Sequence, residues 1–395
     1  MAVPAQEWII SAFTFAFGCC IGSFLNVVIY RLPREKSLVS PGSACPGCGK
    51  PIRFYDNIPL ISWLVLRARC RHCGARISPR YFVVELLTGL VFLGLYLVYF
   101  HTVLRQGMQA PDGWFVYLVH VILLAALIAG SGIDLELWII PLSICWFATA
   151  VGFVGSAVGG YLIDPEIIRT YSLLPVASPT TGALALGAGG GLAVGLLLLK
   201  TGLLKHSYEV PESDEKPGPA EEKPKVEKGA FPFADDPEFN HRLEAVREIA
   251  FLVPIVVGAV VANAVLTRPG AVAAWWAGLL EVPAVAGFLG SLFGYFVGCA
   301  VVWATRVLGT LAFGKEAMGL GDVHLMGAAG AVVGPVMVVV AFFVAPFFGL
   351  GWAVFQMVSK KIRQIPYGPF LSFAVFTVMI LHDRIVKEFA FLFSH

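Results

Sequence analysis

Long apolar runs alternate with short polar segments along most of this chain. The runs lie at about residues 8–30, 81–100, 114–133, 137–160, 181–200, 248–267, 283–310, 325–357 and 368–388. At about 1.5 Å per residue, a helical run of some 20 residues crosses a hydrocarbon core of roughly 30 Å. None of the runs has the strict alternation of apolar and polar positions that a barrel strand requires. The pattern predicts an all-α membrane protein, a bundle of about 8–10 helices, whose run at 325–357 is a hairpin turning at Gly334-Pro335.

The composition agrees with a chain that lies in a lipid bilayer. Apolar residues make up 57% of the 395 residues and charged residues only 14%, and the mean hydropathy is +0.78. A soluble globular protein of this length does not have such a balance. The net charge of +2 is no sign of nucleic acid binding, so we expect the bilayer as a partner and no nucleic acid.

The charges around the first apolar run predict the orientation of the chain. No Lys or Arg precedes this run, whereas residues 31–80 contain ten Lys or Arg and two acids. Basic residues in short loops mark the cytoplasmic side of a membrane. We therefore expect an uncleaved N-terminal anchor at 1–30 with its amino terminus outside, followed by a cytoplasmic segment at 31–80.

Half of the eight cysteines form two Cys-x-x-Cys pairs within the basic segment. They are Cys45, Cys48, Cys70 and Cys73. Two short turns of this kind can hold one tetrahedral Zn²⁺, and we expect Gly47, Gly49 and Gly74 to provide the positive φ that such turns need. Disulfides are the alternative, but the cytoplasm keeps thiols reduced. We predict a structural zinc site here, and buried free thiols for the four cysteines in apolar runs.

Two aspartates stand beside apolar runs, where a carboxylate is costly and calls for a reason. Asp134 lies in SGIDLELWIIP, and Asp322 lies in GKEAMGLGD directly after Gly319 and Gly321. Counting crossings from an outside amino terminus places both acids at the cytoplasmic face. The two glycines remove side-chain bulk beside Asp322, which would let an extended substrate approach closely.

Two neighbouring carboxyl groups cannot easily both ionise, so they share a proton. One can then act as general base on a water molecule while the other polarises a scissile carbonyl, which is peptide hydrolysis without a metal. Paired membrane acids also serve proton-coupled transport, and the residues alone leave both functions open. Glu136 and Glu316 lie nearby, where they could assist the pair or simply face water.

The predicted elements give five parts. They are the anchor at 1–30, a cytoplasmic zinc-binding domain at 31–80, transmembrane helices with the first aspartate at 81–200, a disordered acidic and proline-rich cytoplasmic loop at 201–247, and transmembrane helices with the second aspartate at 248–395. The loop is predicted to be disordered because residues 205–247 contain 11 of the 26 acids and little apolar mass. Its end, at 237–247, could continue as a polar helix into the next apolar run.

Several motifs occur in the order found in the type IV prepilin peptidase family, which this chain resembles. They are GCCIGSFLNVVIYRLP at 18–33, the paired Cys-x-x-Cys segment, PIRFYDNIPLISWLVLRARCRHCGARISPRYFVVELLTG at 51–89, Asp134, Asp322 within GLGD, and IPYGPFLSFA at 365–374. The resemblance covers about residues 8–160 and 283–385. The segment at about 165–282 has no counterpart in the short members of that family.

The resemblance implies an aspartic protease of the GxGD type in the bacterial inner membrane, with Asp134 and Asp322 as its catalytic pair. Its expected substrates are type IV prepilins or type II secretion pseudopilins, whose leader peptides would be removed at the cytoplasmic face. The resemblance also implies methylation of the new amino terminus with S-adenosylmethionine. It assigns no residues to the methyl donor.

Overall fold

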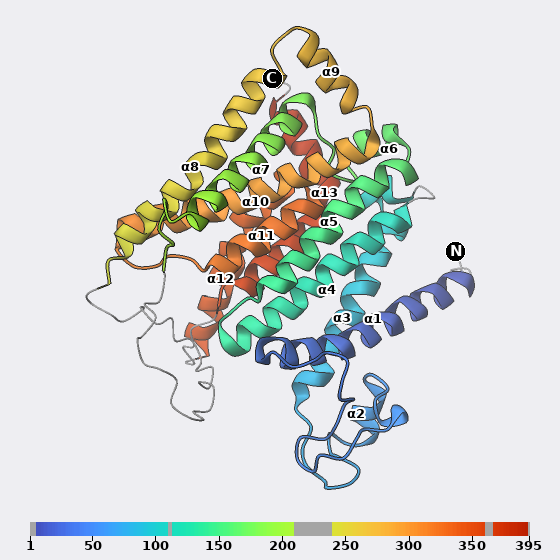
Figure 1. Ribbon diagram of the computed structural model, residues 1–395. Helices are drawn as coiled ribbons and strands as arrows, with labels where there is room; N and C mark the ends of the chain where they lie inside the picture. The colour runs from blue at the N-terminus through green and yellow to red at the C-terminus, as the bar shows by residue number, and fades with distance from the viewer. Residues whose placement is uncertain (1–4, 110–112, 209–238, 360–365, 394–395) are drawn as a thin grey trace. The chain divides into compact units, whose positions relative to one another are not determined.

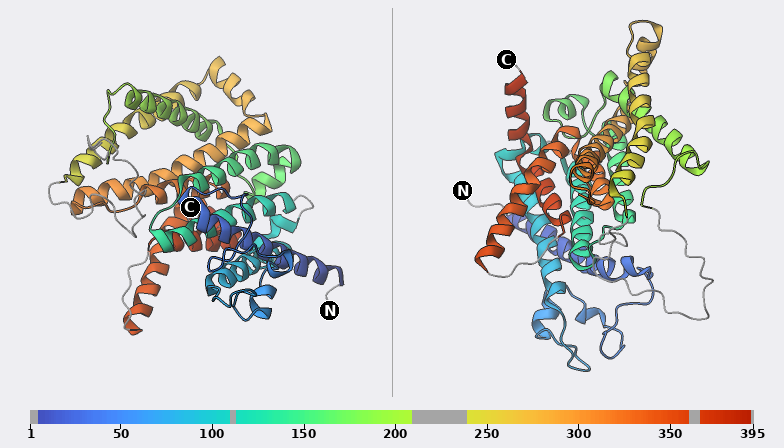
Figure 2. Two further views of the ribbon diagram at one scale, coloured as in Figure 1. Left: turned by 60° about the horizontal axis from the view of Figure 1, so that its bottom comes forward. Right: turned by 90° about the vertical axis from the view of Figure 1, so that its left-hand side faces the viewer.

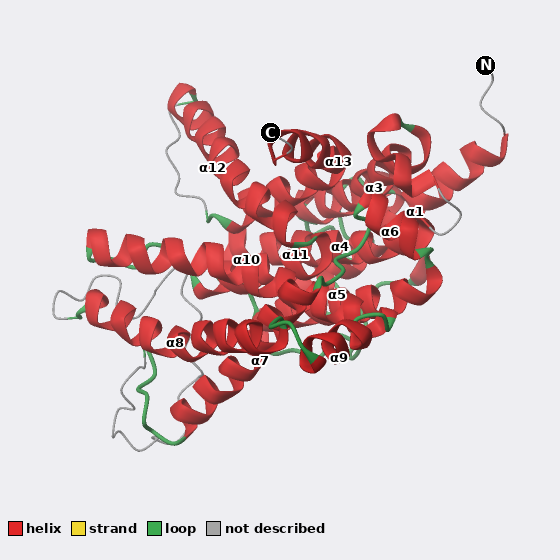
Figure 3. Cartoon of the chain, turned by 90° about the horizontal axis from the view of Figure 1, so that it is seen from above, coloured by secondary structure: helices red, strands yellow, loops and turns green. Residues whose placement is uncertain are grey.

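The computed structural model describes residues 5–109, 113–208, 239–359 and 366–393, and this part of the chain is helical without strands (Figure 3). Nine of its helices are long and apolar enough to cross a membrane. They are α1 (Ala5–Arg31), α3 (Pro79–His101), α4 (Gly113–Leu137), α5 (Leu142–Leu162), α7 (Pro179–Lys200), α8 (His241–Leu266), α10 (Pro283–Phe313), α12 (Pro335–Val358) and α13 (Gly368–Phe393). The predicted all-α membrane fold is confirmed.

The chain forms two compact units, one of Met1–Ile133 with Phe376–His395 and the other of Asp134–Val375. In the first unit, α1 packs closely along α3. A Cβ added at Gly18 would lie 2.9 Å from the Cα of Gly89, and one added at Gly22 would lie 2.7 Å from the Cα of Glu85. Small residues at these positions allow the two backbones to approach, as is common between membrane helices.

The polar segment between α1 and α3 consists of turns, short 3-10 helices and α2 (Ile61–Val65). The carboxylate of Glu85 on α3 accepts a hydrogen bond from the backbone N–H of Leu60, at 2.8 Å. Within the segment, the guanidinium of Arg71 donates to both oxygens of Asp56, at 2.7 to 3.1 Å, and holds the pKa of that carboxyl below its usual range. These contacts attach the segment to α3 and stabilise its loops.

In the second unit, α10 packs against both α5 and α11 (Leu320–Val333), while α7 and α8 run side by side (Figures 1 and 2). Glycines again mark the closest approaches. A Cβ at Gly298 of α10 would lie 2.2 Å from the carbonyl oxygen of Met326 on α11, and one at Gly187 of α7 would lie 2.2 Å from the carbonyl oxygen of Gly258 on α8. The short helices α6 (Pro165–Tyr171) and α9 (Ala271–Leu279) connect the longer ones.

The predicted hairpin at 325–357 is confirmed, and its turn is at the expected dipeptide. Gly334 has φ 85° and ends α11, and Pro335 is the first residue of α12. Proline suits the first turn of a helix, and positive φ favours glycine. With 14 residues, α11 is shorter than the helices that can span a membrane.

Residues 209–238 of the predicted loop at 201–247 lie outside the described residues. The end of this range is the polar start of α8, which begins at His241. Asn240 caps this helix by accepting from the N–H of Leu243, so the polar start of α8 is helical although it is not apolar. Of the cysteines in apolar runs, Cys20 is exposed on its helix instead of buried.

Candidate active site

Asp134 lies in the last turn of α4, and only 5% of its surface is exposed. The backbone N–H of Gly368, the first residue of α13, donates to its Oδ2 atom at 3.2 Å. A Cβ at position 368 would lie 2.6 Å from that oxygen, so a side chain there would displace the carboxyl group. The start of α13 therefore fixes the carboxyl group of Asp134.

Asp322 lies in the first turn of α11 and is 9% exposed. Its backbone N–H donates to the carbonyl of Gly319, the N-cap residue, at 3.2 Å. Its Oδ1 atom is buried and has no hydrogen-bond partner among the described residues. A buried carboxyl oxygen without a partner is costly and calls for an explanation, such as a catalytic role or a bound water molecule.

The second unit brings these two carboxyl groups together. Their charges lie near enough to act on each other. Between their segments, a Cβ at Gly321 would lie only 2.9 Å from the Cβ of Ile140, which follows α4. The space beside Gly321 that we expected a substrate to use is therefore filled by Ile140, because the glycine allows the end of α4 and the start of α11 to pack closely.

Two buried carboxyl groups that act on each other cannot easily both ionise, because like charges would then stand close together away from water, so such a pair can share one proton. A pair that shares a proton is a base and an acid at the same time. The unpartnered Oδ1 of Asp322 is free to bind a water molecule or a carbonyl oxygen. The arrangement fits the acid–base hydrolysis of a peptide bond.

The first unit contains a separate cluster of four cysteines. The Sγ atoms of Cys45, Cys48, Cys70 and Cys73 all lie within 4.8 Å of one another, and those of Cys45 and Cys73 are 3.8 Å apart. Four thiolates at about 2.3 Å from a tetrahedral metal ion would be separated by about 3.8 Å. The cluster therefore has the dimensions of a four-thiolate metal site.

The turns around this cluster explain its geometry. In the first turn, the N–H of Gly49 donates to the carbonyl of Cys45, and in the second, Gly74 donates to Cys70. Gly49 and Gly74 have φ of 69° and 70°, as predicted, whereas Gly47 has no positive φ. Hydrogen bonds from the backbone N–H groups of Cys73 and His72 lower the pKa of Cys70 to about 6.

Sequence reasoning missed two residues that support the aspartates. Gly368 gives Asp134 a hydrogen bond, although its segment stood out only by resemblance. Arg306 lies within α10, is 3% exposed, and forms an ion pair with Glu316. Glu316 is one of the two acids that the sequence placed near the aspartates. The other, Glu136, is half-buried in the last turn of α4. A charge inside an apolar run is the signal that could have drawn attention to Arg306.

Comparison with known families gives a match in the first part of the chain. Residues 16–99 match the model of the bacterial peptidase A24 N-terminal domain. This range includes the four-cysteine cluster, the second half of α1 and most of α3. No solved structure matches the chain.

Several curated proteins are similar to this chain. The prepilin leader peptidase/N-methyltransferase of Myxococcus xanthus is 49% identical over 134 residues, which is 34% of this chain and 36% of that protein. The type 4 prepilin-like proteins leader peptide-processing enzyme of Escherichia coli is 39% identical over 201 residues, covering 44% of this chain and 70% of that protein. The prepilin leader peptidase/N-methyltransferase of Aeromonas hydrophila is 35% identical over 205 residues, covering 42% and 67% respectively. None of these names supports the transporter that the carboxylates alone left open.

Proposed function

This chain belongs to the prepilin leader peptidase/N-methyltransferase family, and on that premise we propose that it is an aspartic endopeptidase that removes leader peptides from type IV prepilins or type II secretion pseudopilins. The observation that carries the proposal is the pair of buried carboxyl groups of Asp134 and Asp322 within one compact unit. The family supplies the substrate class, and the pair supplies the chemistry.

In the proposed reaction, Asp134 and Asp322 hold one proton between them. The ionised carboxylate removes a proton from a water molecule, and the protonated one donates to the carbonyl oxygen of the scissile bond. The hydrogen bond from the N–H of Gly368 orients the carboxyl group of Asp134 for this exchange. The free Oδ1 of Asp322 is then placed to receive the carbonyl.

The proposed location is the bacterial inner membrane, with the amino terminus outside and the active site facing the cytoplasm. From an outside start, α1 brings the basic segment 31–80 inside, and α3 and α4 return the chain to the same face at Asp134. The helices α5, α7, α8 and α10 then bring the chain back to this face at Asp322, because four crossings preserve the side. Both aspartates thus share the face of the basic segment, as the distribution of positive charge favours.

We assign a structural Zn²⁺ to the four-cysteine cluster. The segment at 31–80 has few apolar residues in its interior, and among its described residues Cys45 is the only one that is buried. A segment with so small a core needs a metal ion to hold its fold. The Zn²⁺ supplies this cross-link and takes no part in peptide cleavage.

The family also implies that the new amino terminus is methylated with S-adenosylmethionine as donor. This half of the proposed function rests on the family alone. It is tested by the mass of the product, since cleavage removes the mass of the leader and methylation adds that of one methyl group.

The test is co-expression of the full chain with a candidate prepilin, followed by mass measurement of the pilin. We expect a shortened pilin with the wild-type chain, and an unprocessed one with Asp134→Asn or with Asp322→Asn. Both variants should keep wild-type protein level and zinc content, because asparagine has nearly the same shape and the metal site lies in the other unit. Cleavage that survives either change would reject the role given to that aspartate.

A further inference from the structure

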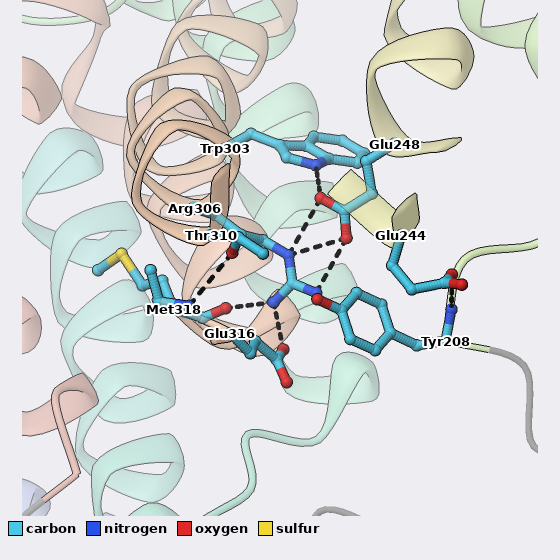
Figure 4. Close-up of polar contacts among 9 residues, drawn as sticks. Tyr208, Glu244, Glu248, Trp303, Arg306, Thr310, Glu316 and Met318 are labelled. Carbon is cyan, nitrogen blue, oxygen red and sulfur yellow. Dashed lines mark hydrogen bonds and ion pairs between the residues drawn. The ribbon is translucent and has the colours of Figure 1, made fainter. Parts of the chain in front are cut away.

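The guanidinium of Arg306 is the centre of a buried polar cluster outside the aspartate pair (Figure 4). It donates to both oxygens of Glu248, from Nε at 2.9 and 3.1 Å, and its Nη2 lies 2.9 Å from the same carboxylate. Its Nη1 atom contacts the carboxylate of Glu316 and the backbone carbonyl of Met318. Arg306 is 3% and Glu248 is 4% exposed, so these charges have lost their water and depend on each other.

The cluster joins three segments that are distant in the sequence. Arg306 is on α10, Glu248 is on α8, and Glu316 and Met318 belong to the loop between α10 and α11 (Figure 4). Trp303 of α10 also donates its indole N–H to Glu248, at 2.9 Å. The carboxylate of Glu248 thus accepts hydrogen bonds from two side chains of α10, those of Trp303 and Arg306. It in turn fixes the direction of the Arg306 guanidinium.

The loop between α10 and α11 lies along one face of α10. Gly314 ends the helix with φ 68°, and the loop turns back so that the N–H of Ala317 donates to Oγ1 of Thr310 at 3.3 Å. A Cβ at Gly309 would lie 2.6 Å from the Cβ of Ala317, so the loop touches the helix directly. Arg306 and Thr310 are one helical turn apart and hold the loop at two points.

The point that Arg306 holds is next to the aspartate pair. The carbonyl of Met318 directly precedes Gly319, the N-cap residue of α11, whose own carbonyl accepts the N–H of Asp322. The positive charge of Arg306 also lies near enough to act on the Asp322 carboxyl group. The position of the Asp322 segment is therefore linked to the direction of the Arg306 side chain.

We propose that Arg306 is a positioning residue for the segment that carries Asp322, and that Glu248 of α8 fixes Arg306 for this task. The role rests on the proposed peptidase function, because positioning matters only if Asp322 acts in the reaction. Glu248 lies in the segment at about 165–282 that falls outside the resemblance to the prepilin peptidase family. That segment therefore contributes to the active site of this chain through one buried ion pair.

The ring of Tyr208 closes the remaining side of the cluster. Its centroid lies 5.0 Å from the guanidinium carbon of Arg306, a distance suited to a cation–π contact. The N–H of Tyr208 donates to Glu244 at 2.8 Å, and Glu244 also binds Arg247. Glu244 is thus a second buried carboxylate of α8 that does not contact Arg306, which makes it a matched control.

The test uses the full chain purified in detergent and compares Glu248→Gln and Arg306→Gln with Glu244→Gln. We expect amide hydrogen exchange in residues 314–321 to become at least about tenfold faster in the first two variants, with the α5 helix unchanged. The kcat for leader cleavage should fall at least about tenfold while KM stays the same, because a misplaced carboxyl group slows the chemical step without removing substrate contacts. Arg306→Lys should recover part of the activity, since lysine keeps the charge but not the forked geometry.

The outcomes separate this proposal from the peptidase assignment. Unchanged exchange in 314–321 in both Glu248→Gln and Arg306→Gln would overturn the positioning role, as would a uniform increase over the whole chain. Equal loss of kcat in Glu244→Gln would also overturn it, because the side-chain oxygen of glutamine can still accept the N–H of Tyr208 and the contacts of Arg306 with Glu248 and Glu316 are unchanged. If the wild-type chain cleaves no prepilin, the peptidase function fails, and the exchange measurement by itself still decides whether Glu248 and Arg306 hold the loop.

Discussion

Replacing Gly298 by alanine is expected to move the helix that carries Asp322. In the structure, a Cβ at this position would lie 2.2 Å from the carbonyl oxygen of Met326 and 2.7 Å from its carbonyl carbon. Ordinary van der Waals contact begins at 3.4 Å, so α10 and α11 must separate by roughly 1 Å. The neighbouring atoms are backbone atoms of a packed helix, which cannot turn aside as a side chain can.

Met326 lies one helical turn after Asp322, so a separation at this point is transmitted to the aspartate. A displacement of about 1 Å at a catalytic group lowers the rate on the order of 100-fold. Overpacking of this kind also destabilises a protein by about 1–3 kcal/mol. We therefore expect Gly298→Ala to lower kcat strongly and to unfold at a lower temperature than the wild type.

The assay is leader cleavage with the purified variant, together with thermal unfolding in the same detergent. Gly351→Ala is the matched control, because that glycine lies within α12 and a Cβ there would meet no atom within 4 Å. The control should keep the wild-type rate and melting temperature. If Gly298→Ala behaved like Gly351→Ala in both measurements, the close contact between α10 and α11 would not set the position of Asp322.

Two further predictions concern the metal and the shared proton. Cys45→Ser combined with Cys70→Ser should remove zinc from the purified protein, as measured by elemental analysis. Cys20→Ser should leave the zinc content unchanged, because Cys20 lies outside the cluster. A wild-type protein without zinc would contradict the assignment. The cleavage rate should fall at low pH, where Asp134 and Asp322 are both protonated, and fall again at high pH, where both are ionised. A kcat that rises to a plateau without an alkaline fall would contradict the shared proton.

The amino-acid sequence was enough to predict the helices and the metal cluster, because both depend on local features. The length of an apolar run decides whether a helix can span a bilayer. The dipeptide Gly334-Pro335 decides where the hairpin turns, because the glycine adopts positive φ and the ring of the proline fixes its own φ at a helical value. A Cys-x-x-Cys turn presents two thiolates whatever surrounds it, so two such turns already indicate one metal ion. The two aspartates stood out because carboxylates are rare beside apolar runs.

The contacts that shape the candidate site depend on how distant helices pack, and no local pattern contains that information. Only the tertiary structure places Ile140 against Gly321 and the N–H of Gly368 on Asp134. It also pairs Glu248 with Arg306, two residues that the sequence places on separate apolar runs. The sequence thus determined which groups are available, and helix packing decided which of them meet. The reason is that a buried charge, or a glycine without a side chain, has no partner until another segment packs against it.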